Sequence, residues 1–324
     1  MLFKNAQLIN KIAVILLVVV CWVLALLIYY KQVIPTVVIQ QSLEHPLKDK
    51  KTVRVLIVGD TGSGDTAQKS VAQLLERLCE EKKAEAVLLL GDNFYFEGVS
   101  SLSDPQWDSK FEEIYNSPCL KDKRFYAVLG NHDYRGAPNA QIYYTLKSDY
   151  RWNMPARFYD VTFGSILSLF AIDSNFPEFC GFAKLCSLDW ILEKMKESLA
   201  HWKVVMGHHP VLSGGKYPEP KWFAGITLPM LICKGKADFY LAGHDHNLQH
   251  LVGPYRNSAC SINQLVAGSG GGDLVDVKPV EGKTKFAIKT HGAIFAEFSE
   301  SSAVFEYYNT EKENPVYFFR QDKK

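Results

Sequence analysis

The sequence predicts an α/β domain in four layers, α-β-β-α, in which two central sheets pack together with helices outside, preceded by one transmembrane helix. Three observations lead to this prediction: apolar runs that alternate with amphipathic segments, hairpin-like patterns after Gly243, and an uncharged apolar stretch near the amino terminus. Alternating helices and strands place helices over a sheet, and the later hairpins supply antiparallel strands.

The composition is that of an ordinary globular protein. The chain has 324 residues, of which 47% are hydrophobic and 22% are charged, and its formal net charge is +1. These values argue against a disordered chain and against a surface that binds nucleic acid. Residues 52–324 suffice for one large domain, which we expect to be the catalytic unit and to be monomeric.

The amino-terminal part of the chain predicts a membrane anchor. Residues 13–30 carry no charge and, at about 1.5 Å per residue, nearly span a hydrocarbon core of roughly 30 Å. Lys4 and Lys11 precede this segment, which predicts a cytoplasmic tail over residues 1–12 and an extracytoplasmic catalytic domain. The alternative is secretion after cleavage of a signal peptide, but no small-residue cleavage site follows the segment. Residues 31–51 are predicted to form a stalk.

The domain begins with a strand over residues 53–58 and a helix that runs from the N-cap Asp65 to about Lys83. A second strand over residues 86–90 completes a βαβ unit. Apolar periodicity predicts further helices at 107–115 and 187–199, and further strands at 125–129, 158–163, 166–172, 203–206, 237–242, 265–267, 293–298, 303–308 and 316–319.

Polar side chains follow five of these apolar runs, each time directly after a glycine. The five blocks are Gly59-Asp60, Gly91-Asp92-Asn93-Phe94-Tyr95, Gly130-Asn131-His132-Asp133, Gly207-His208-His209 and Gly243-His244-Asp245-His246. The carboxyl ends of strands open into the crevice where α/β sheets bind ligands. Oxygen and nitrogen donors without cysteine suit iron, manganese or zinc at a hydrolytic site. A carboxylate can bridge two such cations about 3.5–4 Å apart, and Asp92 is the candidate for that position.

These blocks resemble, in order, the five motifs of the metallophosphoesterases. Tyr95 narrows the resemblance to the purple acid phosphatases, and the small, mammalian-type tartrate-resistant acid phosphatases look most similar, over roughly residues 53–320. The resemblance implies a four-layer metallophosphoesterase sandwich. It also implies that small phosphomonoesters or phosphoproteins are hydrolysed by metal-activated hydroxide with an acidic pH optimum.

The resemblance also implies a ligand for each position of a binuclear metal centre. A ferric ion, Fe(III), would take Asp60, Tyr95 and His246, and Tyr95 as a phenolate would give a purple colour. A divalent iron, zinc or manganese ion would take Asn131, His208 and His244. Asp92 would bridge the two metals.

Two further residues of the motifs are implied to act on the substrate. His132 would be the catalytic residue that stabilises the phosphate or protonates the leaving oxygen. Asn93 would contact the substrate, as His132 would. No role is predicted for His201, His250 or His291, which we interpret as structural.

Two departures from the family pattern affect the predicted catalysis and its regulation. Tyr217 stands where the small members carry a further histidine, nine residues after the position of His208; Lys216, Tyr217 or His209 could take its role. The segment 175–186 looks shorter than the protease-sensitive loop of the family, which predicts that proteolytic activation is absent.

Several alternatives remain open at this point. His209 could be a metal ligand in place of His208. A phosphodiesterase or protein phosphatase of the same superfamily is a second enzymatic interpretation, although protein phosphatases have Asp-Arg-Gly where this chain has residues 94–96. A non-catalytic, membrane-anchored binding protein is a third, although all predicted ligand positions are intact. Residues 268–272, which are rich in glycine, are predicted to form a strand-end turn near the metals and not a phosphate-binding loop.

Six cysteines lie outside the apolar segment, namely Cys79, Cys119, Cys180, Cys186, Cys233 and Cys260. An even number in an extracytoplasmic domain permits disulfides without fixing their pairing. We favour Cys180 with Cys186, against the alternative that several of the six stay reduced in the core.

Overall fold

The structure, a computed structural model, describes residues 15–22, 40–47, 51–149, 151–175, 188–215, 223–254 and 259–323. The chain divides into two compact units, Met1–Val38 and Ile39–Lys324. Residues 15–22 of the first unit are helical and exposed. No helix among the described residues is both long and apolar enough to cross a membrane, and residues 13–14 and 23–30 of the expected anchor lie outside the described residues.

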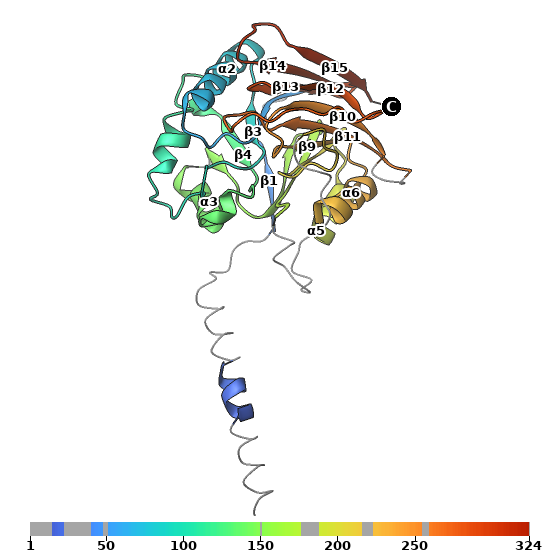
Figure 1. The fold of residues 1–324 in the computed structure, drawn as a ribbon. Coiled ribbons are helices and arrows are strands. Elements are labelled where there is room, and N and C mark those ends of the chain that lie inside the picture. Colours follow the sequence, from blue (N-terminus) through green and yellow to red (C-terminus); the bar gives the residue numbers. More distant parts are fainter. Residues whose placement is uncertain are drawn as a thin grey trace, which may run out of the picture. The chain divides into compact units, whose positions relative to one another are not determined.

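The second unit contains two sheets (Figure 1). In the described residues, the strands of the first sheet are β1 (Gln40–Glu44), β6 (Phe158–Phe163), β7 (Leu167–Ile172), β8 (Trp202–Met206), β9 (Phe239–Ala242), β10 (Leu248–Pro254), β11 (Ser261–Ala267) and β12 (Thr284–Ile288). Their order is β1-β6-β7-β8-β9-β11-β10-β12. The strands of the second sheet are β2 (Thr52–Val58), β3 (Ala86–Leu89), β4 (Arg124–Ala127), β5 (Trp152–Asn153), β13 (Gly292–Ser299), β14 (Ser302–Asn309) and β15 (Tyr317–Asp322). Their order is β15-β14-β13-β2-β3-β4-β5.

Helices cover the outer faces of the sheets, with α2 on one side and α5 and α6 on the other (Figure 1). The helices are α2 (Thr66–Lys82), α3 (Pro138–Lys147), α5 (Leu188–Glu197), α6 (Phe223–Gly235), the π-helix η1 (Asp108–Glu112) and the 3-10 helices η2 (Leu120–Asp122) and η3 (Asp133–Arg135). Met195 of α5 and Leu228 of α6 belong to the apolar cluster that covers the first sheet. Between the sheets, the rings of Phe239 in β9 and Phe305 in β14 lie 4.6 Å apart. The layered α/β fold is therefore confirmed.

The strands that precede the polar blocks run in the same direction within each sheet. β2 pairs in parallel with β3, and β3 with β4. In the other sheet, β8 pairs in parallel with β9, and β9 with β11. Their carboxyl ends therefore lie at a common edge, where loops from both sheets can meet.

The first helix begins where the sequence predicts. The Asp65 carboxylate accepts hydrogen bonds from Ala67 N at 2.9 Å and Gln68 N at 3.1 Å, which satisfies free donors of the first turn. The helix expected over residues 107–115 is instead largely replaced by η1, where Glu113 N donates to Asp108 O. Apolar periodicity does not distinguish this wider turn from an α-helical one.

The expected stalk differs most from the structure, because residues 40–47 belong to the domain. Strand β1 pairs in parallel with the edge of the first sheet, from Gln40 opposite Phe158 to Glu44 opposite Thr162. His45 is buried, with Nδ1 2.8 Å from Tyr126 Oη. The boundary predicted after residue 51 is therefore wrong for this stretch: β1 supplies backbone partners to an edge strand that would otherwise lack them.

Among the described residues, two disulfides join segments that are distant in sequence. Cys79 in α2 bonds to Cys119, and Cys233 in α6 bonds to Cys260. These four cysteines are therefore not reduced core residues. The favoured pair at positions 180 and 186 lies outside the described residues. Disulfides are typical of proteins outside the cytosol, which agrees with an extracytoplasmic or secreted domain.

Candidate metal centre

All seven side chains expected to bind metal lie in loops at the carboxyl ends of five strands. Asp60 follows β2, Asp92 and Tyr95 follow β3, Asn131 follows β4, His208 follows β8, and His244 and His246 follow β9. Although they come from both sheets, their side chains form two adjoining groups.

The first group consists of Asp60, Tyr95 and His246. Tyr95 Oη lies 2.9 Å from Asp60 Oδ1 and 3.0 Å from His246 Nε2. His246 Nε2 lies 3.2 Å from the same Asp60 oxygen. Ligand atoms that surround one cation at about 2.0–2.2 Å in octahedral geometry are about 3 Å apart. The spacing of these three atoms therefore fits a single metal ion.

The second group consists of Asn131, His208 and His244. His208 Nε2 lies 3.2 Å from Asn131 Oδ1 and 3.1 Å from His244 Nδ1. His208 is fully buried, so its imidazole meets these atoms without competition from bulk water. The donor set, one amide oxygen and two imidazole nitrogens, suits a divalent transition metal.

Asp92 lies between the two groups. Its Oδ2 is 3.6 Å from His208 Nε2 of the second group. Ligand atoms of Asp92, Asp60 and His246 also lie within 4.8 Å of one another, which places Asp92 beside the first group. This is the position that a bridging carboxylate requires.

The backbone at three of these residues adopts the left-handed region. The φ angles are 58° at Asp60, 50° at Asp92 and 67° at His244. Such conformations cost on the order of 1–3 kcal/mol each for residues other than glycine and tend to occur at functional sites. Hydrogen bonds hold them in place: His244 N donates to Asp60 Oδ2 at 2.8 Å, and Asp60 N donates to Gly91 O at 2.9 Å.

Backbone carbonyl groups set the orientation of the histidine rings. His208 Nδ1 lies 2.9 Å from Leu90 O, and His246 Nδ1 lies 2.7 Å from Asp273 O. A carbonyl oxygen only accepts, so in each neutral ring Nδ1 carries the hydrogen and Nε2 presents its lone pair to the centre. A hydrogen bond from the ring nitrogen that does not face the metal to a carbonyl oxygen is typical of histidines that bind metal.

The directions of the pKa shifts indicate that Tyr95 and His246 of the first group hold protons where a cation is expected. Burial and the carboxylates of Asp60 and Asp92 raise the pKa of Tyr95 well above its usual value. Burial lowers the pKa of His246, but its contact with Asp60 outweighs this and raises the pKa to about 9. Burial and neighbouring imidazoles lower the pKa of His244. A cation bound by the first group would displace the protons of Tyr95 and His246.

The glycine-rich stretch 268–272 is a strand-end turn beside these ligands, as predicted. Gly272 N donates to Asp60 O at 2.9 Å. A Cβ atom at Gly272 would lie 2.7 Å from His246 Cε1 and 3.2 Å from Tyr95 Oη. Glycine at this position therefore leaves room for both ligands of the first group.

His132 lies at the open side of the centre. Its side chain is 18% exposed, and Nε2 lies 4.0 Å from Asp92 Oδ2. Nδ1 lies 2.8 Å from Phe96 O, which directs Nε2 toward the centre. The ring packs edge-on against Tyr95, with centroids 4.6 Å apart. This location suits a group that contacts a bound phosphate ester.

Asn93, in contrast, points into the domain. It is only 3% exposed, and its Nδ2 donates to Val128 O at 2.8 Å and to Gln141 Oε1 at 3.2 Å. The expectation that Asn93 contacts substrate is therefore not supported by the structure. Its side chain instead fastens the loop after β3 to its surroundings.

Asp133 is a residue whose importance the sequence analysis missed. It is fully buried, and its carboxylate accepts hydrogen bonds from Gly130 N at 2.8 Å, Gln141 Nε2 at 2.9 Å and Asn93 N at 3.1 Å. Burial and the nearby Asp92 carboxylate raise its pKa, against the effect of these donors. Asp133 thus ties together the loops that carry Asp92 and Asn131. Its place two residues after Asn131 is the signal that could have revealed this role.

His209 lies beside the second group. Its Nδ1 is 2.7 Å from Ser174 Oγ, and its ring centroid is 4.7 Å from that of His244. Ring nitrogens of His208, His209 and His244 lie within 4.8 Å of one another. Burial and His208 lower the pKa of His209 to about 3. Only His208 meets Asn131 in this geometry, which favours His208 as the ligand. Positions 216, 217 and 176–186 lie outside the described residues.

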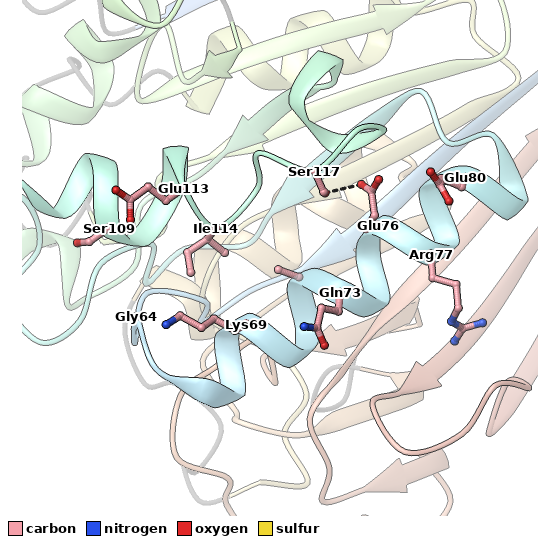
Figure 2. Close-up of a pocket in the computed structure, with 11 residues that line it drawn as sticks. Gly64, Lys69, Gln73, Glu76, Arg77, Glu80, Ser109, Glu113, Ile114 and Ser117 are labelled. Carbon is pink, nitrogen blue, oxygen red and sulfur yellow. Dashed lines mark hydrogen bonds between the residues drawn. The ribbon is translucent and has the colours of Figure 1, made fainter.

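A separate cavity of about 650 Å³ opens between α2 and residues 109–117 (Figure 2). Its wall includes Lys69, Glu76 and Arg77 and none of the expected metal ligands. Glu76 is already engaged, since it accepts hydrogen bonds from Ser117 Oγ at 2.5 Å and Cys119 N at 2.8 Å. This cavity therefore contributes nothing to the metal centre.

Comparison with known proteins agrees with this site. Residues 53–248 match the family described as calcineurin-like phosphoesterase. The chain is 32% identical to purple acid phosphatase 17 of Arabidopsis thaliana over 293 residues, which covers 83% of this chain and 84% of that protein. It is 31% identical to tartrate-resistant acid phosphatase type 5 of Homo sapiens over 241 residues, which covers 66% of this chain and 74% of that protein.

Two solved structures share the fold. One is GAP50, described as the anchor in the inner membrane complex of Plasmodium, with 25% identity, a TM-score of 0.71, and coverage of 85% of this chain and 90% of that one. The other is the purple acid phosphatase PPD1 from yellow lupin seeds, with 16% identity, a TM-score of 0.67, and coverage of 83% of this chain and 53% of that one. The second likeness concerns the fold alone.

Proposed function

Because the chain belongs to the calcineurin-like phosphoesterase family and, within it, to the purple acid phosphatases, we propose that it hydrolyses phosphate monoesters at a binuclear metal centre and works best in acid. Family membership shows that the chain is a metal-dependent hydrolase of phosphoesters. We propose in addition that its substrates are monoesters, that its pH optimum is acidic and that its metals are those named below.

The observation that carries the proposal is the pair of adjoining donor groups that share Asp92. Asp60, Tyr95 and His246 would hold Fe(III), and Asn131, His208 and His244 would hold a divalent iron, zinc or manganese ion. When bound, such a pair clamps a phosphate group and lowers the pKa of a water molecule, so that hydroxide is available at mild pH.

Tyr95 supports the assignment of a trivalent cation to the first group. Its phenol is buried beside the carboxylates of Asp60 and Asp92, which raise its pKa well above the usual value. Loss of that proton therefore requires strong positive charge nearby. A ferric ion supplies more charge than a divalent ion, and a phenolate on it would absorb visible light.

His132 is the residue that we assign to the leaving group. Since its Nδ1 donates to Phe96 O at 2.8 Å, Nε2 is the ring atom that faces Asp92 and the open side of the centre. A proton held at Nε2 can be given to the leaving oxygen, or it can form a hydrogen bond to the phosphate.

We also propose that the enzyme is anchored in a membrane through residues 13–30, with the catalytic domain outside the cytosol. Support comes from the uncharged apolar sequence of this segment, from the helical residues 15–22 and from the two disulfides. Secretion after cleavage is the alternative. Sequencing the amino terminus of the mature protein from membrane and soluble fractions distinguishes the two: an intact terminus in the membrane fraction supports the anchor, and a new terminus beyond residue 30 refutes it.

The enzymatic proposal is tested with the full chain, purified in detergent, by measuring metal content, the absorption spectrum and the release of phosphate from phenyl phosphate between pH 4 and 8. We expect about two metals per chain, a visible band and the highest rate in acid. A colourless active protein would refute the ferric assignment. A protein without metal and without activity would refute the proposed function and favour a binding scaffold.

A further inference from the structure

An aromatic side chain stands exposed at the rim of the proposed centre. Phe96 is 72% exposed, although the preceding residue, Tyr95, is buried. Its ring centroid lies 6.0 Å from that of Tyr95 and 6.3 Å from that of His132. A single exposed phenylalanine on a surface needs no explanation. This one adjoins the residue assigned to the leaving group, so it lies where the substrate's leaving group must pass.

Hydrogen bonds fix the backbone that carries Phe96. Its carbonyl oxygen accepts from His132 Nδ1 at 2.8 Å, and Tyr95 N donates to Gly62 O at 2.9 Å. Lys110 Nζ donates to Tyr95 O. The backbone from which the ring projects is therefore held in a fixed position relative to His132 before a ligand arrives. A rigid aromatic surface binds with a smaller loss of conformational entropy than a flexible one.

A cation lies on the same rim. Arg135 in η3 is exposed, and its Nη1 lies 3.5 Å from Phe96 O. Within the described part of the chain, no carboxylate lies within salt-bridge distance of this guanidinium; other surface arginines do have such a partner, for example Arg320 with Asp322 at 2.7 Å. Arg135 therefore remains able to pair with an anion that a ligand brings.

We propose that Phe96 and Arg135 form the subsite for the leaving group, and that this subsite selects aryl phosphomonoesters whose ring carries a negative charge. The inference rests on the proposed phosphomonoesterase function. With the phosphate at the metal centre and its leaving oxygen toward His132, the organic group extends over the neighbouring rim. An aromatic ring can pack on Phe96 there, and a carboxylate on that ring can reach Arg135.

The hydrolysis consumes one water molecule for each ester. The bond between phosphorus and the aryl oxygen breaks, the oxygen of water joins phosphorus, and a proton from His132 goes to the leaving oxygen. One proton of the water stays on the phosphate, and the other restores the proton of His132. The products are a phenol and inorganic phosphate. Phe96 and Arg135 take no part in the bond changes, and their contribution is to binding and orientation.

The test compares kcat/KM for phenyl phosphate, 4-carboxyphenyl phosphate and glycerol 2-phosphate, which share the phosphate but differ in ring and charge. Phe96→Ala should lower the ratio of phenyl to glycerol phosphate about threefold to tenfold, the range of one aromatic contact. Arg135→Gln should lower the ratio of carboxyphenyl to phenyl phosphate about twofold to fivefold, as for one exposed ion pair. Phe96→Trp, which keeps an aromatic ring, should preserve the first ratio.

Matched controls come from β15, where Phe318 is 66% exposed and Arg320 is also exposed. Phe318→Ala and Arg320→Gln should leave both ratios unchanged. A readout in which the aryl ligand itself is not hydrolysed is competitive inhibition: Phe96→Ala should weaken inhibition by phenylphosphonate more than inhibition by inorganic phosphate.

The outcomes separate this inference from the function on which it rests. If Phe96→Ala lowers kcat/KM for all three substrates by the same factor, the subsite is wrong and the phosphatase function stands. If the metal-loaded wild-type protein hydrolyses none of the three, the proposed function itself fails.

Discussion

Replacing Asp133 by asparagine should destabilise the fold and weaken metal binding, because Asp133 holds the loops that carry Asp92 and Asn131. The substitution keeps the volume of the side chain, so it creates no cavity, but an NH2 group takes the place of one carboxylate oxygen. If that oxygen is Oδ2, the buried donor Gly130 N at 2.8 Å loses its acceptor, whereas Asn93 Nδ2 keeps Val128 O at 2.8 Å and Gln141 Oε1 at 3.2 Å. Each buried donor left without a partner costs about 1–3 kcal/mol.

A second effect of Asp133→Asn acts in the opposite direction. Burial and the Asp92 carboxylate raise the pKa of Asp133, which means that the charged form is disfavoured in the folded protein. Removing the charge recovers part of this cost. We therefore expect a net loss of about 1–2 kcal/mol in the free energy of unfolding. We also expect metal affinity to fall about 10- to 100-fold, because the loops that carry Asp92 and Asn131 lose a common anchor.

Urea unfolding of the metal-free protein measures the first quantity for Asp133→Asn, and metal titration measures the second. Asp276→Asn is a suitable control, because Asp276 is exposed and pairs with Lys289 on the surface. A variant at position 133 that unfolds within about 0.5 kcal/mol of the wild type and binds metal equally well would refute the proposed role of Asp133.

Three further predictions follow from the structure. Tyr95→Phe should abolish the visible absorption band, and an unchanged spectrum would rule out Tyr95 as the ligand that gives colour. Replacing Cys79 and Cys119 together by alanine opens a loop with a sequence separation of 40 residues and should cost about 4 kcal/mol in urea unfolding at neutral pH; a much smaller loss would mean that the bond strains the fold. Burial lowers the pKa of His250 to about 4. Below pH ~6.5 the unfolded chain therefore binds a proton that the folded chain binds only near pH 4, and stability should fall by roughly 3 kcal/mol over that range. His250→Gln should flatten this slope in pH-dependent unfolding, and an identical slope would contradict the assignment.

Much of the site was predictable from sequence because each block of ligands follows an apolar run and a glycine. Asp60 and Asp92 come directly after a glycine at the end of a strand, and the parallel arrangement of those strands brings the two carboxylates together. The grouping of the seven residues around two metals, in contrast, was implied by the resemblance to the purple acid phosphatases.

The direction of individual side chains in the loops was not predictable in the same way. Asn93 follows Asp92, whose left-handed backbone, with φ of 50°, redirects the chain. The side chain of Asn93 consequently meets Asp133, and not the open side of the centre. No regular periodicity links position to direction in such a loop, so the inward position of Asn93 could not be inferred from spacing.

Helix α3 and strands β5, β10 and β12 were also not predicted, but β1 and α6 escaped prediction for reasons of composition. Strand β1, Gln40–Glu44, is mostly polar and mostly exposed, and only pairing with the edge strand β6 makes it a strand. Helix α6 is apolar on most of its surface and contains Pro229, so it lacks the pattern of an amphipathic helix. In both cases tertiary contacts outweigh the local signal.

Metal analysis of the Asp92→Ala protein, alongside the wild type, tests the central claim most directly. Because Asp92 borders both donor groups, its loss should remove both metals and the phosphatase activity together. The wild type should hold about two metals per chain. A variant that retains two metals, or that remains active without metal, would contradict the account of a binuclear centre bridged by Asp92.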